Sequence, residues 1–266
     1  MELRSVLFPA DVNIESLLEY RGTWKALYPS SATQQQVQTR LRRFLRFCFD
    51  NGWITKLPKL SPIKVDEPPT LPLSKEEYEA LLAKIPEVFK DESKIKRVRA
   101  LIQLMRHSGL AIRDAVTLAR AEIQHDKKKG WYRVTTSRQK TGTHVSVLLP
   151  ADVANEILTV TNNNPRYLFW TGNGLETSVV TGWQHDLRAL FRAVFGKTTH
   201  FTPHCLRDTF AVECLSAGIP LEEVSKLLGH SSVKTTEKSY SPWVVMRQDR
   251  LDSLVAASWA KGVAQQ

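Results

Sequence analysis

Cysteine is scarce in this sequence, and its spacing matches neither a zinc site nor a redox motif. The 266 residues contain three cysteines, Cys48, Cys205 and Cys214. An odd number without any C-x-x-C spacing argues against a disulfide framework and against a bound metal. The sequence therefore predicts a protein of a reducing, intracellular compartment, without a metal site.

Long apolar runs are absent as well. No run reaches the roughly 18 residues that a membrane span needs. The first twenty residues, MELRSVLFPADVNIESLLEY, carry acidic and basic side chains and lack the apolar centre of a signal peptide. We therefore expect no membrane partner and a cytoplasmic protein.

The charge balance is strongly basic. Thirty-seven Lys and Arg against 27 Asp and Glu give a net charge of +10 and a pI near 9.6. Such a balance favours a polyanionic partner, of which nucleic acid is the commonest, although a generic basic surface would look the same. Between residues 31 and 64 the only acid is Asp50, against seven basic residues: Arg40, Arg42, Arg43, Arg46, Lys56, Lys59 and Lys64.

The segment SATQQQVQTRLRRFLRFCFDNGWI predicts an amphipathic helix that ends at Asn51-Gly52. Its apolar stripe consists of Val37, Leu41, Phe44, Leu45 and Cys48. A solvated charged face would explain the interleaved arginines. The alternative is contact with a DNA phosphate backbone through Arg40, Arg42, Arg43 and Arg46.

A proline-rich segment divides the chain. LPKLSPIKVDEPPTLP holds five prolines in 16 residues, which is typical of a linker because proline lacks the amide donor and fixes φ. We predict a small helical domain over residues 1–65 and a larger domain over residues 73–266. The second domain is expected to begin with a helix capped by Ser74 and Glu77.

The larger domain is predicted to be mainly α with one small antiparallel β-sheet. GWYRVTTSRQKTGTHVSVLLP alternates, is rich in β-branched residues and has Thr141-Gly142 between its halves, which predicts a β-hairpin. RYLFW is a further candidate strand. The helical segments that follow are VVTGWQHDLRALFRAVFG, HCLRDTFAVECLSAG and PLEEVSKLLGH.

Several chemistry-bearing residues follow one another in this domain. His204 and Arg207 are three apart, so they share a helix face, although a surface pair has the same spacing. His230 follows a helix that ends at Gly229, where it either projects into a cleft or caps the helix, and where the helix dipole favours its protonated form. Tyr240 ends the polar stretch LLGHSSVKTTEKSY.

Arg113, in HSGLAIRDAVTL, and Lys140, beside the hairpin turn, complete the set. Two arginines, a lysine, two histidines and a hydroxyl nucleophile are what metal-free phosphoryl transfer requires. Fixed guanidinium groups can neutralise the charge that develops on the phosphate oxygens in place of a metal ion.

The segment TPHCLRDTFAVECLSAGIPLEEVSKLLGHSSVKTTEKSY resembles the C-terminal signature of the tyrosine recombinase (phage integrase) family. It contains that family's H-x-x-R box, its L-G-H-S-S box and a tyrosine ten residues after the histidine. Weaker resemblance extends back to about Leu73, through Ser108–Leu110 and the lysine hairpin.

The resemblance implies a site-specific recombinase that cleaves and rejoins double-stranded DNA through a 3′-phosphotyrosine, without metal, ATP or other cofactor. Tyr240 would be the nucleophile, freed to reach DNA by a polar, flexible lead-in. Arg113 and Arg207 would hold the phosphate oxygens, and Lys140 would protonate the leaving oxygen. His204 would assist proton transfer and His230 would donate a hydrogen bond to the phosphate.

Two departures from the family pattern stand out. Many members carry their first arginine directly after the G-L pair, where this chain has Ala111, and Arg113 follows two positions later before Asp114. The N-terminal segment, residues 1–65, resembles only the second half of the family's core-binding domain, which predicts a partial domain. A DNA-binding protein that has lost activity and a type IB topoisomerase-like enzyme remain alternatives.

The final segment, PWVVMRQDRLDSLVAASWAKG, has apolar residues at helical spacing. It is expected to pack on its own domain or, as the resemblance implies, to dock into a neighbouring copy. In the second case the protein would act as a homotetramer on paired DNA sites.

Overall fold

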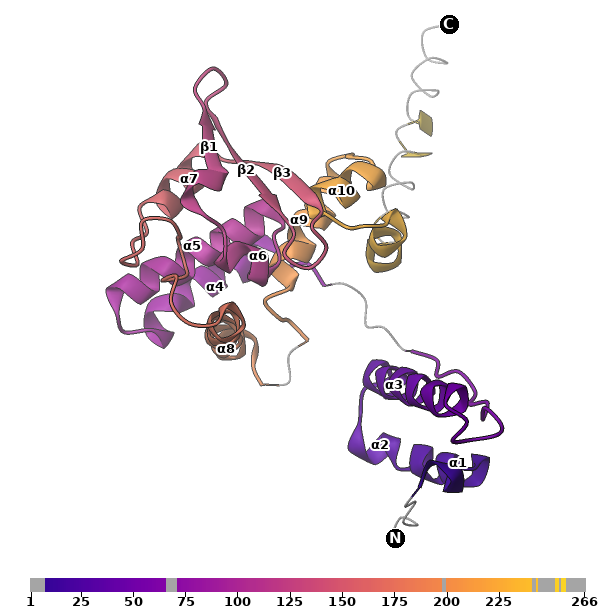
Figure 1. Ribbon diagram of the computed structural model, residues 1–266. Helices are drawn as coiled ribbons and strands as arrows, with labels where there is room; N and C mark the ends of the chain where they lie inside the picture. Colours follow the sequence, from indigo (N-terminus) through magenta and orange to yellow (C-terminus); the bar gives the residue numbers. More distant parts are fainter. Residues whose placement is uncertain are drawn as a thin grey trace, which may run out of the picture. The chain divides into compact units, whose positions relative to one another are not determined.

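The computed structural model describes residues 8–65, 71–197, 200–240, 243, 252–253 and 255–256. The chain separates into two compact units, Met1–Pro69 and Thr70–Gln266 (Figure 1). The division falls within the proline-rich segment.

The first unit is helical. A short 3-10 turn, Pro9–Asp11, precedes α1 (Ile14–Gly22), α2 (Trp24–Leu27) and α3 (Ser31–Asp50). The helix predicted from residue 31 to Asn51 is thus confirmed as α3. The unit's small core consists of Leu17, Leu45, Cys48, Ile54 and Leu60.

The segment after α3 is fastened to the helices by side chains that bind its carbonyl groups. Arg21 Nη1 and Gln38 Nε2 both donate to the Ser61 carbonyl, each at 2.9 Å. The Arg42 guanidinium donates to the Leu60 carbonyl. Proline-rich backbone that cannot pair in a helix or strand is held in this way against the small unit.

The second unit contains seven named helices and three strands in its described part. The helices are α4 (Lys75–Val88), α5 (Glu92–Ser108), α6 (Ile112–Val116), α7 (Ala151–Leu158), α8 (Glu176–Phe195), α9 (Cys205–Ser216) and α10 (Leu221–Leu228). The strands are β1 (Ile123–Asp126), β2 (Trp131–Ser137) and β3 (His144–Leu149). The prediction of a mainly α unit with a small antiparallel sheet is confirmed.

The capping box predicted at the start of α4 is present. The Ser74 Oγ accepts the Glu77 amide at 3.2 Å, and a Glu77 carboxylate oxygen accepts the Ser74 amide at 2.7 Å. Two amides that would lack an intrahelical partner are satisfied, so the helix begins at a defined residue after the proline-rich segment.

The sheet is antiparallel in the order β1-β2-β3. Its β2–β3 pair confirms the predicted hairpin, with Ser137 opposite His144. Strand β1 was not predicted because IQHD is short and buries only its first residue. RYLFW is not a strand, since it contributes a single bridge from Tyr167 to Ala119.

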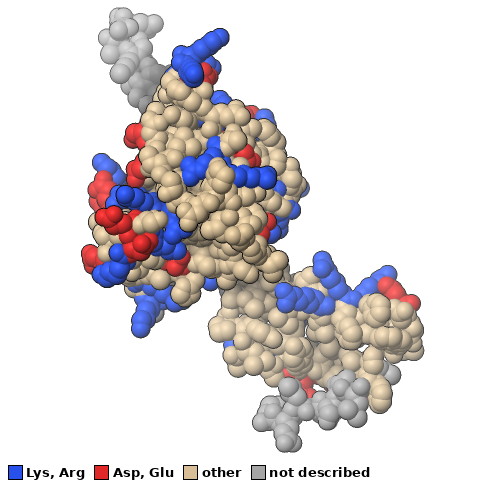
Figure 2. Space-filling view, turned by 60° about the vertical axis from the view of Figure 1, so that its left-hand side comes forward, with Lys and Arg blue, Asp and Glu red and all other residues tan. Residues whose placement is uncertain are grey.

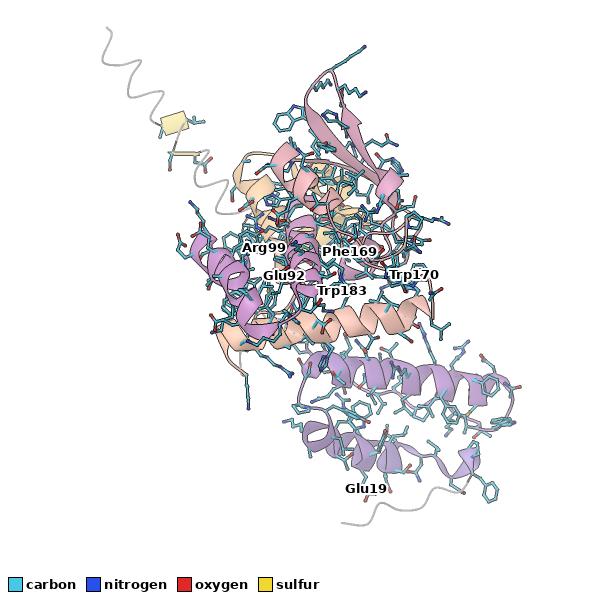
Figure 3. The ribbon with its side chains drawn as sticks, turned by 90° about the vertical axis from the view of Figure 1, so that its left-hand side faces the viewer. Glu19, Glu92, Arg99, Phe169, Trp170 and Trp183 are labelled. Carbon is cyan, nitrogen blue, oxygen red and sulfur yellow. The ribbon has the colours of Figure 1, made fainter. Side chains whose placement is uncertain are left out.

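Helix α5 is the centre of the unit's core. Leu101, Ile102 and Leu104 are fully buried, and α5 packs against α4, α7, α9 and β3. Helix α8 packs against α4 and α6. Its Trp183 ring meets Phe169, in the segment before α8, edge-on with centroids 5.9 Å apart (Figure 3). Helix α5 therefore supports both the sheet, through β3, and the side of the unit formed by α9.

None of the helices in the described ranges is long and apolar enough to cross a membrane.

Candidate active site

Arg207 ties together the ends of two helices. It projects from α9, is only 2% exposed, and donates to the Gly109 carbonyl at the end of α5. It also donates to the Leu228 carbonyl at the end of α10, at 2.8 Å. Both helices end in a left-handed glycine, Gly109 and Gly229, each with φ of 65°. The terminal carbonyls carry partial negative charge, so they are suitable acceptors for a buried cation.

His230 binds Arg207 directly. Its Nε2 lies 2.9 Å from Arg207 Nη2, and its Nδ1 lies 2.7 Å from Thr236 Oγ1. Because a guanidinium group can only donate, Nε2 is the acceptor and Nδ1 carries the proton. Burial, followed by the charges of Arg207, Arg138 and His204, lowers the pKa of His230 to about 4.

His230 is therefore neutral near pH 7 in the DNA-free chain. The expectation that the dipole of the preceding helix favours its protonated form is wrong for this state. Burial and two nearby guanidinium groups outweigh the partial charge at the end of α10.

The Tyr240 hydroxyl is buried rather than held out to solvent. Tyr240 is 2% exposed, and its hydroxyl donates to Asp208 Oδ1 at 2.7 Å. Its ring belongs to an apolar cluster with Ala211, Val212, Leu215, Val224 and Leu228. Residues 233–240 are helical, so the prediction of a flexible lead-in is wrong: the polar sequence forms a helix whose inner face buries Thr236 and Tyr240.

Burial, and then the neighbouring Asp208, raise the pKa of Tyr240, so the hydroxyl keeps its proton. Burial also raises the pKa of Asp208. His204 stands at the edge of this pair, with Nε2 3.7 Å from Asp208 Oδ1 and a side chain that is 61% exposed. A solvent-facing imidazole thus adjoins the buried hydroxyl–carboxylate pair.

Two arginines of the S-G-L region point away from this cluster. Arg113 Nε lies 2.6 Å from Glu176 Oε1 at the start of α8, and Arg106 pairs with Glu213 on α9. Lys140 lies in the turn between β2 and β3, where its side chain is exposed and forms no hydrogen bond or ion pair with a described residue. The structure brings together Arg207, His230 and Tyr240, with His204 at the edge.

Sequence reasoning missed Arg138 and the position of Asp114. Arg138 Nη1 lies 2.9 Å from Asp114 Oδ2, and the Gln139 amide donates to Asp114 Oδ1 at 2.9 Å. Burial, and then the charge of Arg138, lower the pKa of Arg207 to about 10. The sequence feature that could have indicated Arg138 is its place in the predicted hairpin, two residues before Lys140.

In the first unit, the four predicted DNA-contacting arginines have different surroundings. Arg42 is engaged by the Leu60 carbonyl, and Arg46 Nε lies 3.0 Å from Asp50 Oδ1 on the same helix. Arg40 and Arg43 are exposed and have no ion pair with a described residue. Three residues apart on α3, they share a face that is free to meet phosphates.

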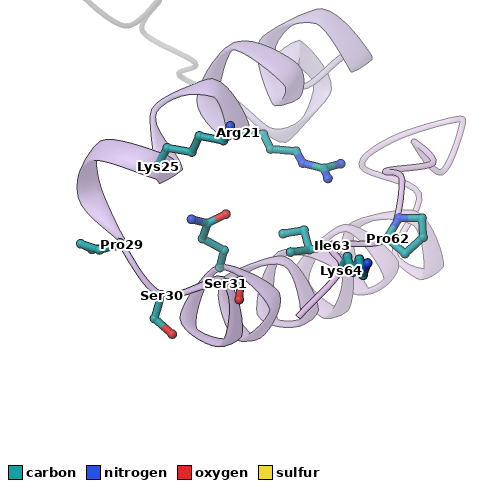
Figure 4. A pocket seen from close by; sticks show the side chains of 9 residues that line it. Arg21, Lys25, Pro29, Ser30, Ser31, Pro62, Ile63 and Lys64 are labelled. Carbon is teal, nitrogen blue, oxygen red and sulfur yellow. The ribbon is translucent and has the colours of Figure 1, made fainter. Parts of the chain in front are cut away.

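The same unit has an open hollow of about 850 Å³ between its helices and the segment that follows α3 (Figure 4). Arg21, Lys25 and Lys64 line it, together with Ser30, Ser31 and Gln34. Lys and Arg side chains are visible on both units, and on part of the larger unit they are mixed with acidic side chains (Figure 2).

No group of three or more His, Cys, Asp or Glu side chains with the arrangement of a metal site occurs among the residues whose structure is described.

The chain is similar to known proteins in sequence and in fold. Residues 72–242 match the model of the phage integrase family. The chain is 30% identical over 246 residues to tyrosine recombinase XerD of Lacticaseibacillus casei, covering 88% of this chain and 79% of that protein. It is 26% identical over 233 residues to tyrosine recombinase XerA of Thermococcus kodakarensis, covering 85% and 77%.

Solved structures share the fold. A XerH site-specific recombinase bound to a palindromic difH substrate matches with a TM-score of 0.66 and 17% identity, over 94% of this chain and 73% of that one. A lambda integrase dimer bound to a COC′ core site matches with a TM-score of 0.64 and 17% identity, over 88% and 80%.

The family match covers well over half of the chain, and the chain therefore belongs to the phage integrase family. Within that family it is a site-specific tyrosine recombinase.

Proposed function

We propose that this recombinase cleaves and rejoins DNA strands through a covalent 3′-phosphotyrosine at Tyr240. The supporting observation is the convergence of a tyrosine hydroxyl, a buried arginine and a histidine at the junction of α9 and α10. The tyrosine oxygen attacks the scissile phosphorus, a phosphotyrosyl bond forms, and the bond to the 5′-oxygen breaks. Rejoining reverses these steps with a new 5′-hydroxyl and requires no ATP.

Arg207 supplies the charge that stabilises the transition state in place of a metal ion. Its guanidinium is held by two carbonyl groups and by His230, so its orientation is fixed before charge develops on the phosphate. His230 is neutral in the DNA-free chain, with Nε2 as an acceptor. It becomes a donor to a phosphate oxygen once Nε2 leaves Arg207 and takes up a proton.

Proton transfer is assigned to Lys140 and His204. Lys140, exposed on the hairpin turn, gives a proton to the departing 5′-oxygen, as a general acid must be able to reach the leaving group. His204, beside Asp208, assists removal of the tyrosine proton. Both roles carry over from the family resemblance at matching positions.

Tyr240 must leave Asp208 before it can attack. In the DNA-free chain its hydroxyl is buried and protonated against a carboxylate. DNA binding therefore has to break a 2.7 Å hydrogen bond and release the ring from its apolar cluster. The buried state keeps the nucleophile unreactive until a substrate is present.

Recombination of two sites is proposed to use four copies of this chain, joined through the C-terminal segment. Most of that segment, including Val244, Leu251 and Leu254, lies outside the described residues. Sedimentation of the protein alone and with paired DNA sites tests this part of the proposal. A complex with paired DNA sites that contains fewer than four copies of the chain would contradict it.

The test of the chemistry is covalent capture. The protein is mixed with nicked duplexes tiled from the DNA flanking its own gene, and adducts are separated on a denaturing gel. The wild-type chain should form an adduct that Tyr240→Phe does not form. DNA binding without any adduct would instead support a DNA-binding protein that has lost activity.

A further inference from the structure

Arg138 lies against the L-G-H turn that holds the active-site histidine. A Cβ added to Gly229 would stand 2.8 Å from Arg138 Cγ and 3.0 Å from Arg138 Cδ. The stem of Arg138 therefore packs directly on the backbone that precedes His230. Its side chain is 14% exposed, so the guanidinium is largely withdrawn from bulk solvent.

The charge of Arg138 shifts the pKa values of two residues that contact the phosphate in the proposed reaction. It lowers the pKa of both Arg207 and His230, and in each case burial is the largest cause of the shift. Two guanidinium groups that lie close together and are partly shielded from water repel each other unless an anion lies between them. Asp114, 4% exposed, is the acid that Arg138 contacts.

Arg138 also has a donor without an acceptor. Its Nη1 is paired with Asp114, whereas its buried Nε has no hydrogen-bond acceptor among the described atoms. A buried donor without an acceptor is costly, and a phosphate oxygen that enters the site would satisfy it. Arg113, by contrast, is exposed and already paired with Glu176.

Asp114 positions Arg138 by fixing the hairpin turn to α6. One carboxylate oxygen accepts the Gln139 amide and the other faces the Arg138 guanidinium. The turn that carries Arg138 is thereby anchored to the helix that starts directly after Ala111. Arg138 thus contacts the helix whose N-cap is Ala111, the position at which many family members carry their first arginine.

We propose that Arg138, held by Asp114, is the second phosphate-binding arginine of this recombinase, in place of the arginine that Ala111 replaces and in preference to Arg113. This inference rests on the proposed function. Arg138 and Arg207 hold the non-bridging oxygens of the scissile phosphate, which gives Arg138 a catalytic role and Asp114 a positioning role.

Adduct formation on the duplex that captures the wild-type chain tests this assignment. Arg138→Ala should slow the adduct by about 100-fold or more, as expected for loss of one preorganised donor. Arg113→Ala, the matched control, should stay within about threefold of wild type. Asp114→Asn should fall between them, because the guanidinium remains but is less firmly held.

A neutral methylphosphonate at the scissile position adds a readout that a folding defect would not change. With one charged oxygen removed, the transition state needs less neutralisation, so the loss in Arg138→Ala should shrink by at least about tenfold. An unchanged loss would indicate a structural role and overturn the assignment. A large loss in Arg113→Ala would overturn it as well.

Thermal unfolding in sulfate separates this inference from the proposed function. Sulfate should raise the melting temperature of the wild-type chain and of Arg113→Ala more than that of Arg138→Ala, because a bound anion stabilises the folded state. Equal shifts in all three would overturn the anion-binding role of Arg138. Absence of a wild-type adduct on every duplex would contradict the proposed function alone.

Discussion

Gly229→Ala should destabilise the larger unit more than the same change at Gly130, a left-handed glycine in open space. Gly229 has φ of 65°, and a Cβ there would lie 2.5 Å from Val145 Cγ2 and 2.8 Å from Arg138 Cγ. The left-handed conformation costs an L-residue about 1–2 kcal/mol. Overpacking a close contact costs about 1–3 kcal/mol more. The expected loss in the free energy of unfolding is therefore about 2–5 kcal/mol.

Gly130→Ala is the matched control. Gly130 has φ of 69° and nothing within 4 Å of an added Cβ, so only the conformational cost of about 1–2 kcal/mol applies. Urea unfolding followed by circular dichroism measures both variants against wild type. Equal losses at the two positions would refute the claim that Arg138 and Val145 pack tightly on the L-G-H turn.

Three further predictions concern DNA binding by α3, the protonation of His230 and the role of Lys140. Arg40→Ala and Arg43→Ala should each weaken DNA binding and reduce the slope of log affinity against log salt by about one, whereas Arg46→Ala, already paired on its helix, should change the slope less. Because folding lowers the pKa of His230 from 6.5 to about 4, the unfolded chain binds the extra proton between these values, so stability should fall from pH 7 to pH 4. Urea unfolding at both pH values should show a smaller fall in His230→Asn; an equal fall would contradict the lowered pKa. Lys140→Ala should lose adduct formation on ordinary DNA yet regain it when sulfur replaces the bridging 5′-oxygen, because a thiolate leaves without a general acid; failure to regain it would remove Lys140 from that role.

Local patterns were sufficient to predict most of the elements. The amphipathic stripe of α3, the capping box of α4 and the alternating hairpin each follow from neighbouring residues. Strand β1 was not predicted because its formation depends on its pairing with β2 rather than on its own four residues. RYLFW, although apolar, forms one bridge only.

The candidate site was predicted less completely, for a physical reason. The H-x-x-R spacing places His204 and Arg207 on one helix face, and the L-G-H box places His230 directly after the next helix. Both are visible in the sequence. The approach of Arg138 to Gly229 joins residues 91 positions apart and depends on how β3 packs against α10.

The burial of Tyr240 likewise could not be read from its polar neighbours. It depends on the apolar face that α9 and α10 present, and on Asp208 as an acceptor for the hydroxyl. The local sequence predicted a flexible lead-in to Tyr240, whereas the tertiary environment determines the position of its side chain.

The central claim is that Tyr240 becomes covalently joined to a 3′-phosphate. The most direct test is to digest the purified adduct with protease and nuclease and to identify the modified peptide by mass spectrometry. The account predicts a nucleotide linked through its 3′-phosphate to Tyr240, with a free 5′-hydroxyl on the other strand end. A link to another residue, or to a 5′-phosphate, would contradict it.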